Sequence, residues 1–176
     1  MTEVPADTRY RLDVVARNVP EVVAFAGGWL VDRVMAGWDV TVLLSADEDV
    51  RPLEILGVAT HDLEAALDEW ADRPHPQTVA VAAELFASDE RVRRGVLGAL
   101  DHGLTEVTLW GEHWPEELDS TISSVHHRLS GAARAFKAQA LAATAAPAAG
   151  IVGDTESFRC GLAALQSVAA DLIPAG

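Results

Sequence analysis

The sequence predicts an α/β fold: a mostly parallel, five-stranded sheet with helices on both faces, Rossmann-like but without the nucleotide fingerprint, followed by a C-terminal helical pair. Apolar runs typical of buried strands alternate with segments whose apolar residues recur every three or four positions, as on one face of a helix. Short connections containing glycine or proline separate these runs. The 176 residues, 49% hydrophobic and 23% charged, match one globular domain.

The first strand–helix–strand unit carries the clearest signals. Residues 10–16 place apolar side chains on one face of a strand. Asn18 then stands at an N-cap position with Glu21 three residues later, a capping-box-like start for a helix over residues 19–36. Residues 38–44 form the most regular apolar run and are expected to be the second strand. This order predicts a βαβ unit.

The same alternation continues to about residue 110. Asp62 stands where it would cap the next helix, and glycines or prolines separate the following segments. Strands alternating with helices favour a parallel sheet covered on both faces. Further strands are expected at residues 58–61, 78–83 and 105–110, and further helices over residues 63–70 and 89–101.

After Pro115 the periodicity changes to a heptad-like stripe. Apolar residues spaced by four and three positions predict one helix from about residue 115 to residue 143. Asp154 is expected to cap a last helix with its own apolar face. We therefore divide the chain into an α/β sheet core, residues 1–114, and C-terminal helices, residues 115–176, within a single domain overall. The stripe is Leu118, Ile122, Val125, Leu129, Ala132 and Phe136, and the last helix carries Phe158, Leu162, Leu165, Val168 and Leu172.

The stripe needs a cover, and two are available. The last helix can fold back across the segment between residues 145 and 153, or a second chain can pack on the stripe. Two apolar helices at one end of a domain form a self-complementary patch, which favours a homodimer. The predicted interface residues are Leu118, Ile122, Val125, Leu129 and Phe136.

Net charge excludes several classes of partner. The chain has 13 Lys+Arg against 27 Asp+Glu, a formal charge of −14. Nucleic acids and anionic membranes are bound through clustered basic residues, so neither is expected as a partner. The single cysteine, Cys160, permits no internal disulfide. With no apolar leader or long apolar run, a cytoplasmic protein is expected.

Nucleotide-binding signals are missing from the sequence. No G-x-x-x-x-G-K-[ST] motif occurs, and the only lysine is Lys137. Gly27-Gly28 would resemble half of a dinucleotide turn if residues 21–26 were a strand, with Asp47 at the ribose. The Asn18–Glu21 cap argues instead for a glycine pair within a helix, where it permits close packing. No cofactor is expected.

Candidate site residues lie where the predicted strands end, because ligands of open parallel sheets bind there. Asp47 and Asp49 follow a strand and are candidate ligands for a divalent cation, although a solvated acidic loop is the simpler explanation. Glu112 and His113 stand between two tryptophans and, with Asp47, are candidate catalytic residues; the simpler explanation is that the tryptophans pack and both polar residues face water. An enzyme predicts that these residues converge with Glu84 in one pocket.

Three functions remain open at this level. The first is a non-enzymatic α/β protein that acts through self-association or a protein partner, supported by the heptad stripe. The second is a small enzyme or ligand-binding protein that uses the acidic, His- and Trp-containing rim, with or without a divalent cation. The third is a degenerate nucleotide-binding domain without a phosphate loop. Fold class alone does not choose between them.

Overall fold

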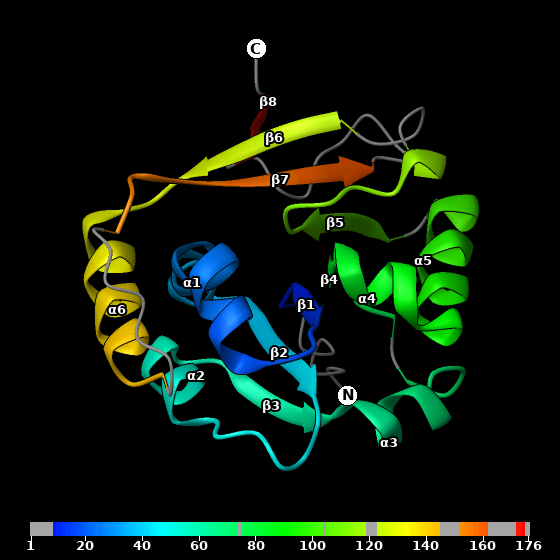
Figure 1. Ribbon diagram of the computed structural model, residues 1–176, viewed down its shortest axis with the longest axis horizontal. Helices are drawn as coiled ribbons and strands as arrows, with labels where there is room; N and C mark the ends of the chain where they lie inside the picture. The colour runs from blue at the N-terminus through cyan, green and yellow to red at the C-terminus, as the bar shows by residue number, and fades with distance from the viewer. Residues whose placement is uncertain are drawn as a thin grey trace, which may run out of the picture.

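The computed structural model has helices on both faces of one twisted sheet (Figure 1). It describes residues 9–73, 75–103, 105–118, 123–144, 152–161 and, for the backbone, 172–174. The α/β class predicted from the sequence is confirmed.

Eight strands form a single mixed sheet in the order β3-β2-β1-β4-β5-β7-β6-β8. The first five run parallel to their neighbours. The last three pair antiparallel, β7 with β5, β6 with β7 and β8 with β6. The strands are β1 (Arg11–Val15), β2 (Asp39–Leu44), β3 (Ala59–Asp62), β4 (Thr78–Ala82), β5 (Glu106–Trp110), β6 (Ser123–Arg128), β7 (Thr155–Gly161) and β8 (Leu172–Pro174).

The helices divide between the two faces of the sheet. Figure 1 shows α1, α2 and α6 on one side and α3, α4 and α5 on the other, with β6 and β7 reaching across α1 toward α6. The helices are α1 (Val19–Met35), α2 (Arg51–Leu56), α3 (Leu63–Asp68), α4 (Ala83–Ser88), α5 (Glu90–His102) and α6 (Gly131–Ala142), with a 3₁₀ turn, η1 (Glu116–Leu118).

Local signals explain why the first part of the chain folds as predicted. The Asn18 side chain accepts a hydrogen bond from the Glu21 amide at 2.9 Å, and Asp62 caps α3 through the Ala65 amide at 2.9 Å. Gly57 ends α2 with φ of +79°, a conformation that favours glycine. All five predicted strands are present within two residues of their expected bounds.

The predicted sheet is nevertheless too small. It is mixed, because β5 pairs antiparallel with β7, and a five-stranded parallel sheet of Rossmann type is therefore wrong. The Thr108↔Cys160 register places residue 160 beside β5, where we expected a helix. Glu156, Phe158 and Cys160 are buried at two-residue spacing, the period of a strand. The predicted last helix beginning at Asp154 is wrong for residues 155–161.

The predicted helix over residues 115–143 is also wrong. Residues 123–128 form β6, and α6 starts only at Gly131, after Ser130 caps it through the Ala133 amide at 3.0 Å. Val125, His127 and Leu129 are buried at alternate positions. A spacing of four, as between Val125 and Leu129, satisfies a strand as well as a helix, and this ambiguity produced the error.

The residues predicted to form an interface lie in different surroundings. Leu118, Val125 and Leu129 are buried within the chain itself, whereas Phe136 is 47% exposed on α6. Ile122 lies outside the described residues. In the described part of the chain, these residues therefore do not form one continuous helical stripe. The homodimer was predicted from that stripe; it stays a prediction, but the stripe no longer supports it.

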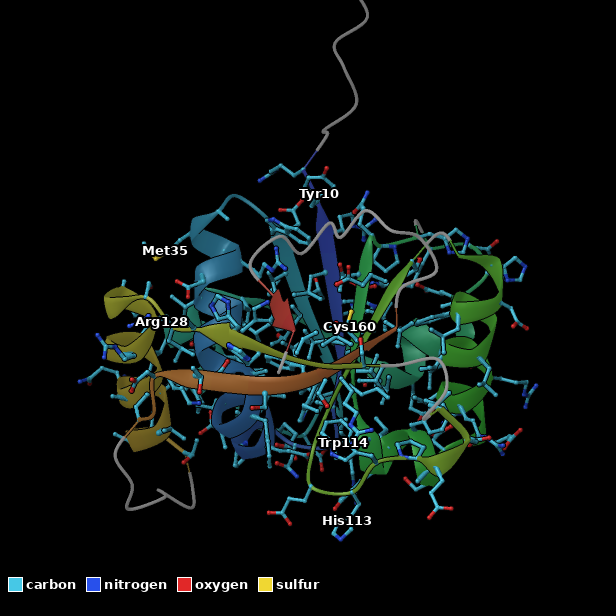
Figure 2. All side chains as sticks on the ribbon, turned by 90° about the horizontal axis from the view of Figure 1, so that it is seen from above. Tyr10, Met35, His113, Trp114, Arg128 and Cys160 are labelled. Atoms are coloured by element: carbon cyan, nitrogen blue, oxygen red, sulfur yellow. The ribbon has the colours of Figure 1, made fainter. Side chains whose placement is uncertain are left out.

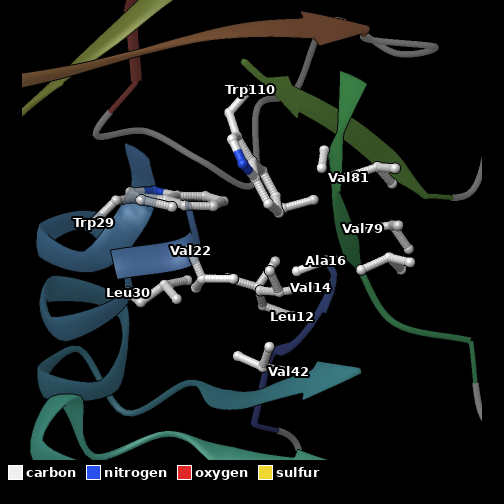
Figure 3. Packing of buried hydrophobic residues seen from close by; sticks show 14 of the residues in the cluster. Leu12, Val14, Ala16, Val22, Trp29, Leu30, Val42, Val79, Val81 and Trp110 are labelled. Carbon is white, nitrogen blue, oxygen red and sulfur yellow. The ribbon is translucent and has the colours of Figure 1, made fainter. Parts of the chain in front are cut away.

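Large apolar side chains fill the space between α1 and the sheet (Figure 3). Trp29 on α1 and Trp110 at the end of β5 are both 0% exposed, and they lie above Val14 and Val22 in this view. Trp29 also packs against Phe158 of β7, with ring centroids 4.9 Å apart.

In the described part of the chain, no helix has the length and apolar character needed to cross a membrane.

A buried ion pair connects α1, α6 and β7. Lys137 Nζ lies 2.8 Å from Glu156 Oε1 and donates a second hydrogen bond to the Ala24 carbonyl at 2.7 Å. The Gly28 and Trp29 amides each donate to the Glu156 carboxylate at 2.8 Å. In a regular α-helix the Gly28 amide donates to the Ala24 carbonyl. Here Glu156 accepts a hydrogen bond from that amide, and Lys137 donates one to that carbonyl.

Gly28 leaves the space in which this contact forms. A Cβ atom at residue 28 would lie 2.1 Å from Leu129 Cδ2 and 3.1 Å from Glu156 Oε1. No real side chain tolerates the first of these distances. The glycine pair of α1 therefore serves close packing, as expected from the cap at Asn18, and the dinucleotide alternative is not supported by the helix in which it lies.

Candidate functional site

The strand order places a topological switch point between β1 and β4. From β1 the chain passes to β2 and β3 on one side, and β4 and β5 lie on the other. At such a point the connections leave in opposite directions, and ligands bind in the crevice beyond the carboxyl ends of the strands. Arg17 and Asn18 follow β1 here, and Glu84 lies in the first turn of α4, directly after β4.

An ion pair joins the two strand ends at the switch point. Arg17 Nη1 lies 3.2 Å from Glu84 Oε2, and both side chains are about half exposed, at 53% and 52%. A pair this exposed contributes little to stability. Its effect is positional, because it keeps one positive and one negative group together at the mouth of the crevice.

Glu21 supplies a second carboxylate close to this pair. It is the third residue of α1 and is half-buried. Burial raises the pKa of Glu21 above its ordinary value, and the neighbouring Glu84 carboxylate raises it further, while Arg17 and the Trp110 indole act in the opposite direction. Two carboxyl groups whose surroundings differ in this way are suited to divide the roles of general acid and general base.

A cavity of about 260 Å³ adjoins the switch point between the ends of β1 and β2. Glu48 accepts a hydrogen bond from the Val19 amide at 3.1 Å, which fixes its carboxylate beside the first turn of α1. The Ser45 hydroxyl donates to Asp47, and this hydrogen bond holds the pKa of Asp47 below its ordinary value. The lining residues are Asn18, Val19, Pro20, Asp47, Glu48, Asp49, Pro52 and Thr144.

The structure brings together some of the predicted site residues and separates others. Asp47 and Asp49 line the cavity, and Glu84 lies at the switch point. Glu112 and His113 are exposed in the loop after β5, and Figure 2 shows His113 at the edge of the molecule, directed away from it. The five residues expected in one pocket therefore occupy at least two separate places.

Two residues of the site were missed in the sequence. Glu21 was assigned only to helix capping, whereas Glu84, Arg17 and the Trp110 indole all influence the pKa of its carboxyl group. Arg17 was passed over because a single arginine after a strand matches no motif. Its position, immediately after the first strand of a predicted parallel sheet, was the available signal.

A second polar cluster contains serine, histidine and aspartate but has the wrong connectivity for a nucleophile. Asp32 accepts hydrogen bonds from His127 Nε2 at 2.7 Å and from Ser130 Oγ at 2.5 Å. In a hydrolase triad the histidine stands between the other two and takes the serine proton. Here the aspartate stands in the middle, so the cluster joins α1 to the β6–α6 connection.

The residues present at the switch point do not form the three-ligand site that a catalytic zinc ion needs. In the described part of the chain, no group of three or more His, Cys, Asp or Glu side chains is arranged to hold one. The four residues after β1, from Ala16 to Val19, offer a guanidinium and an amide but neither imidazole nor carboxylate. A zinc site needs three such ligands, and Arg17 places a positive charge at the same strand end.

Comparison with known proteins identifies the fold. No family model and no curated protein matches the sequence. Among solved structures, the A40926 pseudoaglycone deacetylase is similar with a TM-score of 0.60 and 15% identity, over 91% of this chain and 100% of that one. The zinc-inhibited form of teicoplanin deacetylase has a TM-score of 0.57 and 13% identity, over 86% and 98%. A deacetylase–teicoplanin complex has a TM-score of 0.53 and 15% identity, with the same coverage.

This likeness defines the class as an α/β protein with the fold of these deacetylases. Identities this low show the fold alone. The neighbours are enzymes, and they contradict our interpretation of the chain as a non-enzymatic protein that acts through protein–protein interaction. They favour the alternative, a small enzyme or ligand-binding protein that uses the rim at the carboxyl ends of the strands.

Proposed function

We propose that this chain is an acid–base enzyme with the deacetylase fold that acts on a small acylated molecule at the switch point between β1 and β4. One observation carries the proposal: Arg17 and Glu84 form an ion pair at 3.2 Å where ligands of such sheets bind, and the charges of both act on the neighbouring Glu21 carboxyl group. The solved neighbours are named as deacetylases, which supports an acyl compound as the substrate class.

The roles follow from charge and burial. The exposed Glu84 carboxylate, paired with Arg17, accepts a proton from the attacking water, whose oxygen adds to the acyl carbon. The Arg17 guanidinium stabilises the negative charge that develops on the acyl oxygen. Glu21, whose pKa is raised by burial, donates a proton to the departing nitrogen or oxygen as the acyl bond breaks. The products are a carboxylic acid and a free amine or alcohol.

The acidic cavity beside this cluster supports the orientation of the substrate. Asp47, Glu48 and Asp49 present carboxylates, and no basic side chain is among the residues that line the cavity. Carboxylates accept hydrogen bonds from hydroxyl and ammonium groups. We therefore expect the part of the substrate that remains after deacylation to be rich in hydroxyl groups or to carry an amine.

The test is hydrolysis of a panel of N-acetyl and O-acetyl amino sugars, followed by release of acetate. Glu21→Gln should lower kcat by about 100-fold or more, the usual contribution of a general acid. Glu54→Gln changes an exposed glutamate of α2 and is the matched control. Activity of the native chain should fall as the pH rises through the raised pKa of Glu21, because the acid must be protonated.

Two results would contradict the proposed function. Turnover unchanged in both Glu21→Gln and Arg17→Met would remove these residues from the chemistry. Saturable binding of the panel without release of acetate would contradict hydrolysis and favour the ligand-binding form of the same site. Arg134→Met, at an exposed position of α6, controls for loss of a positive charge.

A further inference from the structure

A larger cavity is lined by residues of α5, of α3 and of the turn after α3. Figure 1 shows α3 and α5 on the side of the sheet away from α1 and α6. Its volume is about 570 Å³, within the range of small-molecule sites. It runs along α5 to the amino ends of β4 and β5, the edge away from the proposed active site. The lining residues are Leu67, Trp70, His75, Pro76, Val79, Arg91, Arg94, Gly95, Gly98, Ala99, His102 and Thr105.

The walls of this cavity are apolar, and two glycines of α5 keep it open. A Cβ atom at Gly95 would lie 3.5 Å from the Trp70 ring, and one at Gly98 would have no atom within 4 Å. A glycine inside a helix costs about 1 kcal/mol relative to alanine. The indole of Trp70 therefore faces an unfilled space that an aromatic ring or acyl chain would occupy.

The charges around the cavity are the reverse of those on the chain as a whole. The protein has 27 acidic against 13 basic residues, yet the lining contains two arginines, two histidines and no carboxylate. Arg91 is bound by Glu64 at 2.8 Å and by Asp89 at 3.2 Å. Arg94 makes only a 4.0 Å contact with Glu90 among the described residues, so its guanidinium is available to an anion.

His102 adds a second polar group where the stretch of α5 that lines the cavity ends. Its Nδ1 lies 2.7 Å from the Gly98 carbonyl. A carbonyl oxygen only accepts, so Nδ1 carries the proton and, in the neutral ring, Nε2 is a hydrogen-bond acceptor. Arg94 and His102 lie on α5 eight residues apart and bracket the open stretch at Gly98.

We propose that this cavity binds an anionic amphiphile, a carboxylate attached to an aromatic ring or short acyl chain. The apolar body lies against Trp70 and fills the space above Gly98, and the carboxylate faces Arg94. This site is separate from the proposed active site and does not depend on it.

The experiment titrates the full chain with sodium octanoate and, in parallel, with octanol. The readouts are calorimetry and the Trp70 indole cross-peak in a ¹H–¹⁵N spectrum, assigned with Trp70→Phe. Octanoate should bind saturably and move that cross-peak. Octanol, which lacks the charge, should bind about tenfold or more weakly, since a charge-assisted hydrogen bond contributes about that factor.

Two variants and one control test the placement. Gly98→Leu fills the cavity and should abolish octanoate binding, whereas Gly131→Leu, at a glycine of α6 that is equally open, should leave it unchanged. Arg94→Gln should weaken octanoate by roughly tenfold and octanol by less than twofold. The proposal is overturned if octanoate leaves the Trp70 cross-peak unmoved, if it binds Gly98→Leu and Gly131→Leu equally, or if octanol binds as tightly as octanoate.

Discussion

Replacement of the chain's only lysine tests the buried ion pair most directly. Lys137 and Glu156 have side chains only 9% and 2% exposed, and each also bonds the backbone of α1. Lys137→Met keeps a long unbranched side chain and removes the charge. It leaves a carboxylate in the core without its cation and the Ala24 carbonyl without that donor.

The expected cost follows from what remains around Glu156. Removing one partner of a buried ion pair costs about 3–5 kcal/mol. Glu156 keeps two amide donors, from Gly28 and Trp29, so we expect the lower end, about 3 kcal/mol. For a chain of this length, each kcal/mol corresponds to about 2–4 °C in Tm. The melting temperature should therefore fall by roughly 6–12 °C.

The deficit should also depend on pH. Burial raises the pKa of Glu156, and Lys137 is the strongest of the groups that lower it. Without Lys137 this pKa rises further in the folded state only. A group whose folded pKa lies above its unfolded value loses its stabilising contribution as pH rises through the folded pKa. The deficit of Lys137→Met should be smaller at pH 5 than at pH 8.

Urea and thermal unfolding at pH 5 and pH 8 measure both effects. Gln139→Met, at an exposed position of the same helix, controls for helix propensity. The double variant Lys137→Met/Glu156→Gln also removes the unpaired carboxylate. It should recover at least half of the stability lost in Lys137→Met. A deficit within about 0.5 kcal/mol of the control, or one that is equal at both pH values, would refute the role assigned to this pair.

Two other contacts make independent predictions. Gly28→Ala should destabilise the fold by about 1–3 kcal/mol in urea unfolding, because its Cβ would lie 2.1 Å from Leu129 Cδ2; Gly98→Ala, in open space, should instead be neutral or stabilising. Burial raises the pKa of Asp32, but hydrogen bonds from Ser130 and His127 outweigh it and leave the pKa below its ordinary value. This stability is present above the unfolded pKa and lost as pH falls, so Asp32→Asn should lower Tm at pH 7 and progressively less toward pH 3; a constant difference would contradict it.

Local chemistry explains which elements were predictable. Asn18 and Asp62 cap the helices that the sequence assigned to them, and the apolar runs of β1, β2 and β4 admit only a strand. These features depend on residues within a few positions of one another. Sequence patterns report such short-range preferences well.

The C-terminal part was mispredicted because its decisive contacts are remote in sequence. Val125 and Leu129 are spaced by four positions, which fits a helical face, yet Val125 belongs to β6, which pairs with β7, and Leu129 directly follows that strand. Lys137 in an alanine-rich helix resembles a solvent-facing residue, and only Glu156 makes it a core residue. The sequence around Lys137 does not indicate that it pairs with Glu156, nor does the sequence around Glu156; only the folded structure brings the two together.

The same distance limited the prediction of the site. Asp47, Asp49 and Glu84 were located correctly at the ends of strands, because a parallel sheet brings those ends to one edge. The role of Glu21 depends on Glu84 and Trp110, which approach it only through the sheet. A capping pattern was sufficient to explain Glu21 locally, and it concealed the second role that we propose for this residue.

The dependence of α1 on Glu156 has a consequence for the order in which the protein can fold during synthesis. The carboxylate that accepts the Gly28 amide is translated 128 residues after that glycine. All five parallel strands have left the ribosome by then, but the middle of α1 still lacks its acceptor and its Leu129 neighbour. A nascent chain or fragment ending near residue 115 therefore contains the whole parallel sheet, but its α1 lacks the Glu156 and Leu129 contacts that it has in the finished protein.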